Sequence, residues 1–166
     1  MRKAGSSRYD LTTLWHFDAP DDAVWDAIVD AEGWPRWWPG VERVVTLARG
    51  DAGGVGARRL CICKSVLPFR LILVTRVTRV EPLRLIEGRV EGELEGVGRC
   101  HVGRDAGLTV VRYDWHVRTT RRWMTRLAPL MKPLFRWNHA VMMQAGGTGL
   151  ARHLGARAGS QTVRPC

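Results

Sequence analysis

The feature that most constrains the fold is a run of short segments between residues 41 and 118 in which apolar and polar side chains alternate. A period of two is typical of β-strands that bury one face. Breaks of a few residues, rich in glycine and proline, separate the segments, and such short connections favour antiparallel neighbours over crossover units. The predicted strands are Val41–Ala48, Ala57–Lys64, Phe69–Val80, Leu85–Leu94, Val97–Val102 and Leu108–Arg118.

The N-terminal part adds one strand and two short helices. Residues 9–19 also alternate and predict the first of seven strands. Residues 20–30 then place Val24, Trp25 and Ile28 on one side of a helix that begins with a proline and two aspartates. The segment 34–40 has room only for a short second helix between its prolines.

The C-terminal part predicts a long helix, because residues 121–158 show apolar positions at spacings of three and four and no strand-like alternation. Pro129 and Pro133 each lack a backbone donor, so we expect a bend or a late start of the helix. With about 100° per residue, the apolar stripe is predicted to contain Leu127, Leu130, Met131, Leu134, Val141, Met142 and Ala145.

Segregated helices and an antiparallel sheet define an α+β fold. The 166 residues fit a single domain, which we place at residues 9–154, with flexible ends at 1–8 and 155–166. Only the long C-terminal helix is large enough to cover a seven-stranded sheet. A sheet that curves around one helix leaves a cavity where the side chains do not meet, and this cavity is the predicted ligand site.

The net charge is +10, from 26 Lys and Arg against 16 Asp and Glu. The basic residues are scattered, so no nucleic-acid partner is expected. The densest basic group, Arg118, Arg121, Arg122 and Arg126, is compatible with a weak contact to an anionic membrane surface. No apolar run is long enough for a secretory signal or a membrane span, so we expect a cytoplasmic protein. The sequence leaves the oligomeric state open.

Signals for a metal, a cofactor or a known catalytic motif are missing from the sequence. Cys61 and Cys63 lie two apart on a predicted strand, about 7 Å between alpha carbons, which is beyond easy disulfide reach. We therefore expect reduced thiols, no metal and no cofactor. His101, His116 and Asp114 have acid–base chemistry, but no spacing brings them together on one wall.

The candidate ligand-binding residues are mainly aromatic and aliphatic side chains on the predicted cavity walls. For the rings plain core packing is the favoured role, and lining a pocket is compatible with it. Asn138 is the exception, because a buried amide needs either an internal partner or a ligand contact. For His139, at the edge of the stripe, a structural role is favoured over catalysis. The candidates are Trp37, Trp38, Phe69, Leu71, Leu73, Tyr113, Trp115, Trp123, Leu127, Met131, Leu134 and Asn138.

Several local strings resemble one superfamily over residues 9–154. They are Ala19-Pro20 followed by Val24-Trp25-Asp26, then Trp34-Pro35-x-Trp37-Trp38-Pro39-Gly40, Gly92-Glu93-Leu94-Glu95-Gly96, Tyr113-Asp114-Trp115, and the stretch from Trp123 to Leu150 with Pro129, Pro133, Asn138 and His139. This set is similar to the START-like (SRPBCC) superfamily, specifically its bacterial polyketide cyclase/dehydrase-type proteins. The resemblance implies a helix-grip fold with an apolar cavity between sheet and helix.

The resemblance leaves two functions open, since members include carriers as well as enzymes. The first is a carrier or binding protein for a hydrophobic molecule such as a lipid, a polyketide or an aromatic precursor. The second is a polyketide cyclase or dehydratase, in which the cavity would fold the substrate and Asn138, Tyr113 or His139 would polarise a carbonyl.

Overall fold

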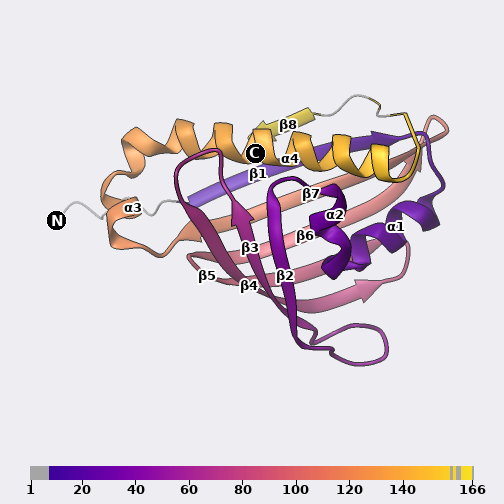
Figure 1. The fold of residues 1–166 in the computed structure, drawn as a ribbon, viewed down its shortest axis with the longest axis horizontal. Helices are drawn as coiled ribbons and strands as arrows, with labels where there is room; N and C mark the ends of the chain where they lie inside the picture. Colours follow the sequence, from indigo (N-terminus) through magenta and orange to yellow (C-terminus); the bar gives the residue numbers. More distant parts are fainter. Residues whose placement is uncertain (1–7, 158, 160–161, 166) are drawn as a thin grey trace.

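The computed structural model describes residues 8–157, 159 and 162–165. Within these residues one eight-stranded sheet has the strand order β2-β3-β4-β5-β6-β7-β1-β8, and its neighbouring strands run antiparallel (Figure 1). The strands are β1 (Arg8–Phe17), β2 (Val41–Ala48), β3 (Arg58–Lys64), β4 (Arg70–Glu81), β5 (Leu85–Gly92), β6 (Leu94–Asp105), β7 (Leu108–Thr119) and β8 (Thr162–Pro165).

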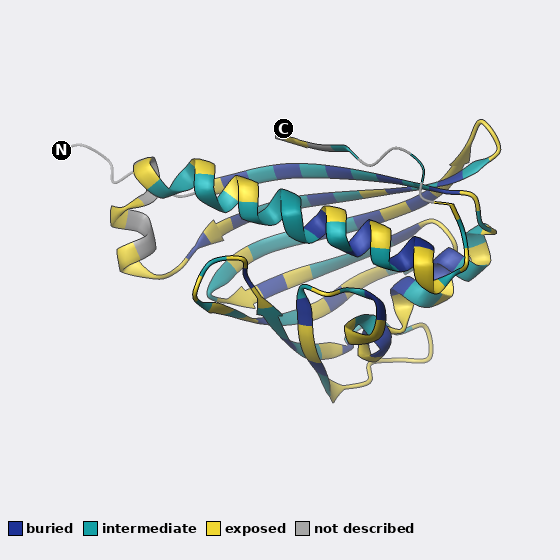
Figure 2. Cartoon of the chain, turned by 45° about the horizontal axis from the view of Figure 1, so that its top comes forward, coloured by how far each residue is buried: buried dark blue, intermediate teal, exposed yellow. Residues whose placement is uncertain are grey.

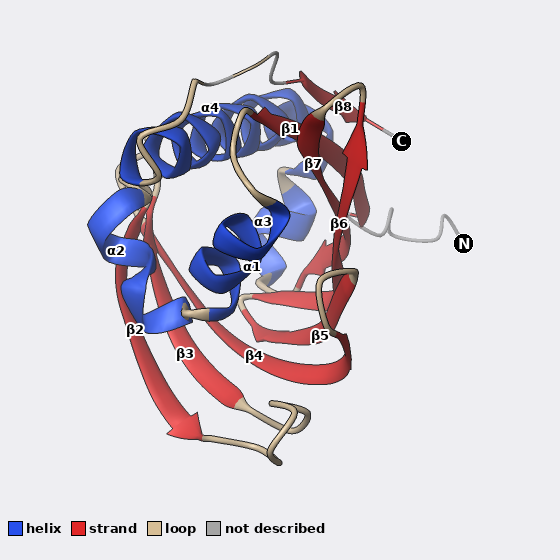
Figure 3. Ribbon diagram, turned by 90° about the vertical axis from the view of Figure 1, so that its right-hand side faces the viewer, coloured by secondary structure: helices blue, strands red, loops and turns tan. Residues whose placement is uncertain are grey.

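The helices lie on the inner side of the curved sheet, which wraps around them when the molecule is viewed end-on (Figure 3). They are α1 (Asp21–Val29), the 3₁₀ turn η1 (Ala31–Gly33), α2 (Trp34–Trp37), α3 (Arg122–Arg126) and α4 (Ala128–His153). The predicted α+β class is confirmed, with seven antiparallel strands curved around a long C-terminal helix and two short helices after the first strand.

The predicted boundary between the fifth and sixth strands is wrong. The strand predicted to begin after Gly96 begins instead at Leu94, so that the turn lies at residues 92–93 and Gly96 pairs with Val117 inside the ladder. A glycine is required there for packing, because a Cβ would lie 2.0 Å from the carbonyl oxygen of His116. The glycine therefore marks a close approach of two backbones, although a strand glycine often marks a break.

The C-terminal segment expected to be flexible contains a strand. Thr162–Pro165 pairs with Leu11–Leu14 of β1 and extends the sheet beyond the seven predicted strands. Four residues with a proline carry too weak an alternation to be recognised as a strand in the sequence. Residues 1–7 of the expected N-terminal flexible end lie outside the described residues, and Arg8 already belongs to β1.

The helix predicted over residues 121–158 is divided at Leu127, which is the N-cap of α4. The expected late start is observed, since α4 begins at Ala128 and Pro129 lies in its first turn, where a proline costs no intrahelical hydrogen bond. Pro133 lies inside α4, and the helix continues past it to His153.

The C-terminal half of α4 is held close to the α2 segment, whereas its N-terminal half is more exposed (Figure 2). Gly146 and Gly149 allow this approach: a Cβ at Gly146 would lie 2.5 Å from the Trp38 indole, and one at Gly149 would lie 1.7 Å from the carbonyl oxygen of Trp37. Trp38 Nε1 also donates a hydrogen bond to the carbonyl oxygen of Met142 (2.9 Å).

The end of the molecule where α4 contacts the α2 segment is its closed end, and the main hydrophobic core lies there. It joins Trp15 and Phe17 of β1 with Trp25 of α1 and Leu150 of α4, all of them buried. Trp15 Nε1 donates to the carbonyl oxygen of Met143 (3.0 Å), which adds a second indole contact to α4. Among the described residues, no helix combines the length and the apolar character that crossing a membrane requires.

Substituting Gly149 by alanine should lower the free energy of unfolding by about 3 kcal/mol or more, because the new methyl group collides with backbone that α2 fixes in place. Gly103→Ala is the matched control, since no atom lies within 4 Å of its Cβ position. Urea denaturation measures both. A Gly149→Ala protein as stable as the control would show that the close approach of α4 and α2 is not required.

Candidate functional site

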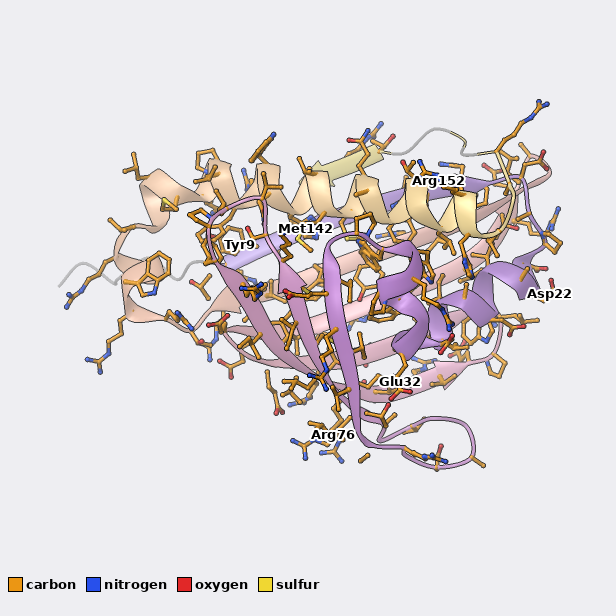
Figure 4. The ribbon with its side chains drawn as sticks, viewed as in Figure 1. Tyr9, Asp22, Glu32, Arg76, Met142 and Arg152 are labelled. Atoms are coloured by element: carbon orange, nitrogen blue, oxygen red, sulfur yellow. The ribbon has the colours of Figure 1, made fainter. Side chains whose placement is uncertain are left out.

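A cavity of about 170 Å³ lies between the inner face of the sheet and the middle of α4. Tyr9 and Met142, two of its wall residues, are labelled in Figure 4. The wall is built by strands β1, β2, β3, β4, β6 and β7, by the loop between β3 and β4, by the α2 segment and by α4. It consists of Tyr9, Leu11, Trp34, Trp38, Val41, Cys61, Cys63, Ser65, Phe69, Leu71, Leu73, Thr75, Leu94, Tyr113, Trp115, Val117, Thr119, Phe135, Asn138, His139, Met142 and Met143.

Strand alternation decides which side chains reach the cavity. Leu71 and Leu73 of β4 belong to the wall, as does Phe69 just before this strand, while Ile72 is 46% exposed on the outer face. The sequence left the facing of this strand open, because Ile72 would be apolar on the outer face, and the structure shows Leu71 and Leu73 inward. β7 follows the same rule, with Tyr113 and Trp115 in the wall.

The structure brings seven of the twelve candidate residues together in the wall. They are Trp38, Phe69, Leu71, Leu73, Tyr113, Trp115 and Asn138. The other five, Trp37, Trp123, Leu127, Met131 and Leu134, do not line the cavity.

Leu127, Met131 and Leu134 were predicted to line the cavity because the predicted stripe of the long helix was centred too far around its axis. The cavity face of α4 contains Phe135, Asn138, His139, Met142 and Met143, and its centre lies about 90° around the axis from the predicted centre at Leu127. Val141 and Ala145 of the predicted stripe face an outer groove next to α2. The search for apolar side chains did not find the buried face of the helix, because that face continues through glycines, which carry no side chain.

Both misplaced tryptophans contact the wall from outside. Trp37 is buried and stacks on Trp38, with ring centroids 5.4 Å apart and planes at 17°. Trp123 is 41% exposed, and its ring meets Phe69 edge-on at 6.3 Å. Trp37 thus supports the wall at the closed end, and Trp123 lies outside it at the α3 end.

Asn138 has a structural role that the sequence left open. Its Oδ1 accepts hydrogen bonds from Ser65 Oγ (3.0 Å) and from the backbone N–H of Val66 (2.9 Å). The amide therefore ties α4 to the loop between β3 and β4. Its carbonyl is already occupied, which leaves the Nδ2 group, 4.0 Å from Met142 Sδ, as its part with spare capacity toward a ligand.

His139 is the functional candidate that sequence reasoning undervalued. Neither ring nitrogen has a hydrogen-bond partner among the described residues, although both atoms are buried. Burial lowers the pKa of His139 to about 4, so the ring is neutral at pH 7. Its ring lies edge-on to Trp115, with centroids 6.4 Å apart. The spacing of four residues from Phe135 was the available signal.

The wall contains no Asp, Glu, Lys or Arg among the described residues. The thiols of Cys61 and Cys63 face the cavity, and burial raises their pKa values, that of Cys63 to about 12, so both stay protonated. The acid–base residues considered from the sequence lie on the opposite face of the sheet, where His101 and Arg112 pair with Asp114. His139 is therefore the wall residue best suited to proton transfer.

Comparison with known families gives one match. A family model described as "Polyketide cyclase / dehydrase and lipid transport" matches residues 10–155. No protein with a curated function is significantly similar to this chain in sequence.

Solved structures share the fold at low sequence identity. TTHA0849 from Thermus thermophilus is 16% identical, with a TM-score of 0.68 over 87% of this chain and 98% of that one. A START superfamily protein from Mycobacterium smegmatis is 13% identical, with a TM-score of 0.72 over 89% and 97%. The ZhuI aromatase/cyclase from Streptomyces sp. R1128 is 17% identical, with a TM-score of 0.65 over 87% and 94%.

The buried, unpartnered His139 makes stability depend on pH. Between pH 6.5 and about 4 the unfolded chain binds a proton on this ring and the folded protein does not. Acidification through this window should therefore lower the free energy of unfolding, by about 3 kcal/mol at its lower end.

Urea denaturation at several pH values measures this loss. His139→Leu should remove most of it, whereas His153→Leu, at an exposed position in the same helix, should keep it. An unchanged pH profile in His139→Leu would contradict the assignment.

Proposed function

The chain belongs to the polyketide cyclase/dehydrase and lipid transport family, and from this premise we propose that it binds a hydrophobic small molecule in the cavity under α4, as a carrier or binding protein. The ligand classes that fit are lipids, polyketides and aromatic precursors. The family relationship alone does not choose among them, because one fold serves many functions.

The observation that carries the proposal is the chemistry of the wall. The described wall residues are apolar or uncharged, and three tryptophans and two phenylalanines contribute large rings. The volume of about 170 Å³ is close to the roughly 150 Å³ of apolar cavities that hold a benzene ring. A larger ligand requires outward movement of α4, and its more exposed N-terminal half is the part free to move.

A second function, cyclisation or dehydration of a poly-β-keto precursor, is favoured by His139. A neutral imidazole inside an apolar wall both accepts and donates a proton, which a cyclisation needs at the carbon that forms the new bond and at the departing oxygen. Incubation with an aromatic poly-β-keto precursor separates the two functions: a carrier returns it unchanged, and an enzyme returns a cyclised product. His139→Leu should then stop turnover while binding persists.

Ligand binding should stabilise the protein, and filling the cavity should abolish that effect. At a ligand concentration near 100 times Kd, the melting temperature should rise by about 5 to 10 °C. Leu71→Trp places a bulky ring in the wall and should remove the rise, whereas Ile72→Trp, one residue away on the outer face, should keep it.

Thermal shift against a lipid and aromatic panel, with native mass spectrometry of the gently purified protein, provides the measurement. The proposal fails if no panel member raises the melting temperature and no bound species is detected, or if the two variants respond alike.

We also propose a weak contact of the α3 end with anionic membranes. Arg118 and Arg121 of the basic group are already paired, with Glu95 and Glu93 respectively. Arg122 and Arg126 are exposed, and the exposed side chains beside them are apolar, namely Trp123, Leu127 and Leu130. Cations next to exposed indole and leucine side chains suit the interface of an anionic bilayer.

Vesicle sedimentation tests this contact. Arg122→Gln combined with Arg126→Gln should reduce partitioning onto anionic phosphatidylserine-containing vesicles roughly thirtyfold, since each cation contributes about 1 kcal/mol near such a surface. Arg58→Gln combined with Arg76→Gln removes two exposed cations from the sheet and should have little effect. Equal partitioning of wild type onto neutral and anionic vesicles would contradict the contact.

A further inference from the structure

One part of the cavity wall carries polar atoms that have no partner. Tyr9 Oη, Trp115 Nε1, Thr119 Oγ1 and both ring nitrogens of His139 are buried, and the described residues offer them no hydrogen bond. Native proteins leave few such groups unsatisfied, because removing a polar group from water without a new partner is unfavourable. Their concentration in one wall calls for an explanation.

These groups are neighbours in space. Trp115 and Thr119 lie on the same face of β7, and Tyr9 of β1 pairs with Val117 between them. Diagonal neighbours in adjacent strands lie about 7 Å apart, within reach of aromatic side chains. His139 completes the group from α4, since its ring lies 6.4 Å from that of Trp115.

Trp115 differs from the other two tryptophans in the wall. Trp34 Nε1 donates to the carbonyl oxygen of Ile28 (3.0 Å), and Trp38 Nε1 donates to that of Met142 (2.9 Å). The structure therefore satisfies two indole donors of the cavity internally and leaves the third without an acceptor among the described residues. An indole N–H is a donor only, so its missing partner must be an acceptor atom.

We propose that Trp115, with Tyr9, Thr119 and His139, forms a polar subsite that selects an uncharged ligand bearing a hydroxyl or carbonyl oxygen, which accepts a hydrogen bond from Trp115 Nε1. This inference rests on the proposed binding function and narrows its ligand class. The polar atoms of these four residues are covered, so small side-chain rotations accompany binding.

The same wall disfavours a charged ligand. The described wall residues include no Lys or Arg to pair with a carboxylate, and no Asp or Glu to pair with an ammonium. The charged residues labelled in Figure 4, Asp22, Glu32, Arg76 and Arg152, lie at the periphery of the molecule. An ionised group buried without a partner is far costlier than a neutral hydroxyl, whose hydrogen bonds the subsite replaces.

Four probes with the same two-ring body test the proposal by isothermal titration calorimetry at pH 7.5. Replacing the methyl group of 2-methylnaphthalene by a hydroxyl gives 2-naphthol, which adds one oxygen at nearly constant shape. The pair 2-naphthamide and 2-naphthoate differs in charge at nearly constant size. Trp115→Phe removes the free donor, and Trp34→Phe is the matched control, because it removes a donor that the protein already uses.

Trp115→Phe should weaken binding of 2-naphthol and 2-naphthamide about five- to tenfold and leave 2-methylnaphthalene within about twofold. Trp34→Phe should shift all three uncharged probes alike. Wild type should bind 2-naphthoate at least about tenfold more weakly than 2-naphthamide.

The subsite is overturned if Trp115→Phe affects the three neutral probes equally, or if the carboxylate binds as tightly as the amide. In either case binding of 2-methylnaphthalene still supports an apolar ligand site. If no probe binds the wild-type protein, including 2-methylnaphthalene, the binding function itself fails. Melting curves of both variants confirm that they are folded.

Discussion

The contact of α4 with the α2 segment is the constraint on which the rest of the structure depends. Two indoles donate to consecutive carbonyls of the helix, Trp38 to Met142 and Trp15 to Met143. Gly146 and Gly149 let the chains approach to distances that no side chain would permit. The helix is thus fixed at its C-terminal half. Its N-terminal half crosses the sheet and is more exposed. The cavity lies beneath the middle of the helix, between the two halves.

The one-sided attachment also accounts for the distribution of polar groups. At the closed end the indole donors find backbone acceptors, and the core there is tightly packed. Farther along, large rings still cover the sheet. Trp115 and His139 contact each other edge-on there, and the polar atoms of neither ring find a hydrogen-bond partner among the described residues. The cavity is apolar because strand alternation directs every charged residue of β7 to the outer face.

Alternation in the sequence predicted seven of the eight strands, and it missed the short β8. Period two leaves two possible facings for each strand, and on β4 the apolar Ile72 left that choice open. The structure places Leu71 and Leu73 in the wall and Ile72 outside it. The helix face could not be predicted in this way. Its orientation depends on Gly146 and Gly149, and a search for apolar side chains gives glycines no weight. Gly96 led to a wrong strand boundary for a related reason: it was interpreted as a break, whereas it allows the backbone of β7 to approach closely.

His139 shows how the site departs from the rest of the fold. One position earlier on the same helix, the Asn138 amide finds partners in Ser65 and Val66. The neutral imidazole of His139 has none among the described residues, and burial lowers the pKa of this ring to about 4. Packing alone would favour leucine or phenylalanine at such a place, because neither has a polar atom to desolvate. In the proposed subsite a ligand that bonds to the ring offsets this cost, so a histidine here lowers stability and favours ligand binding.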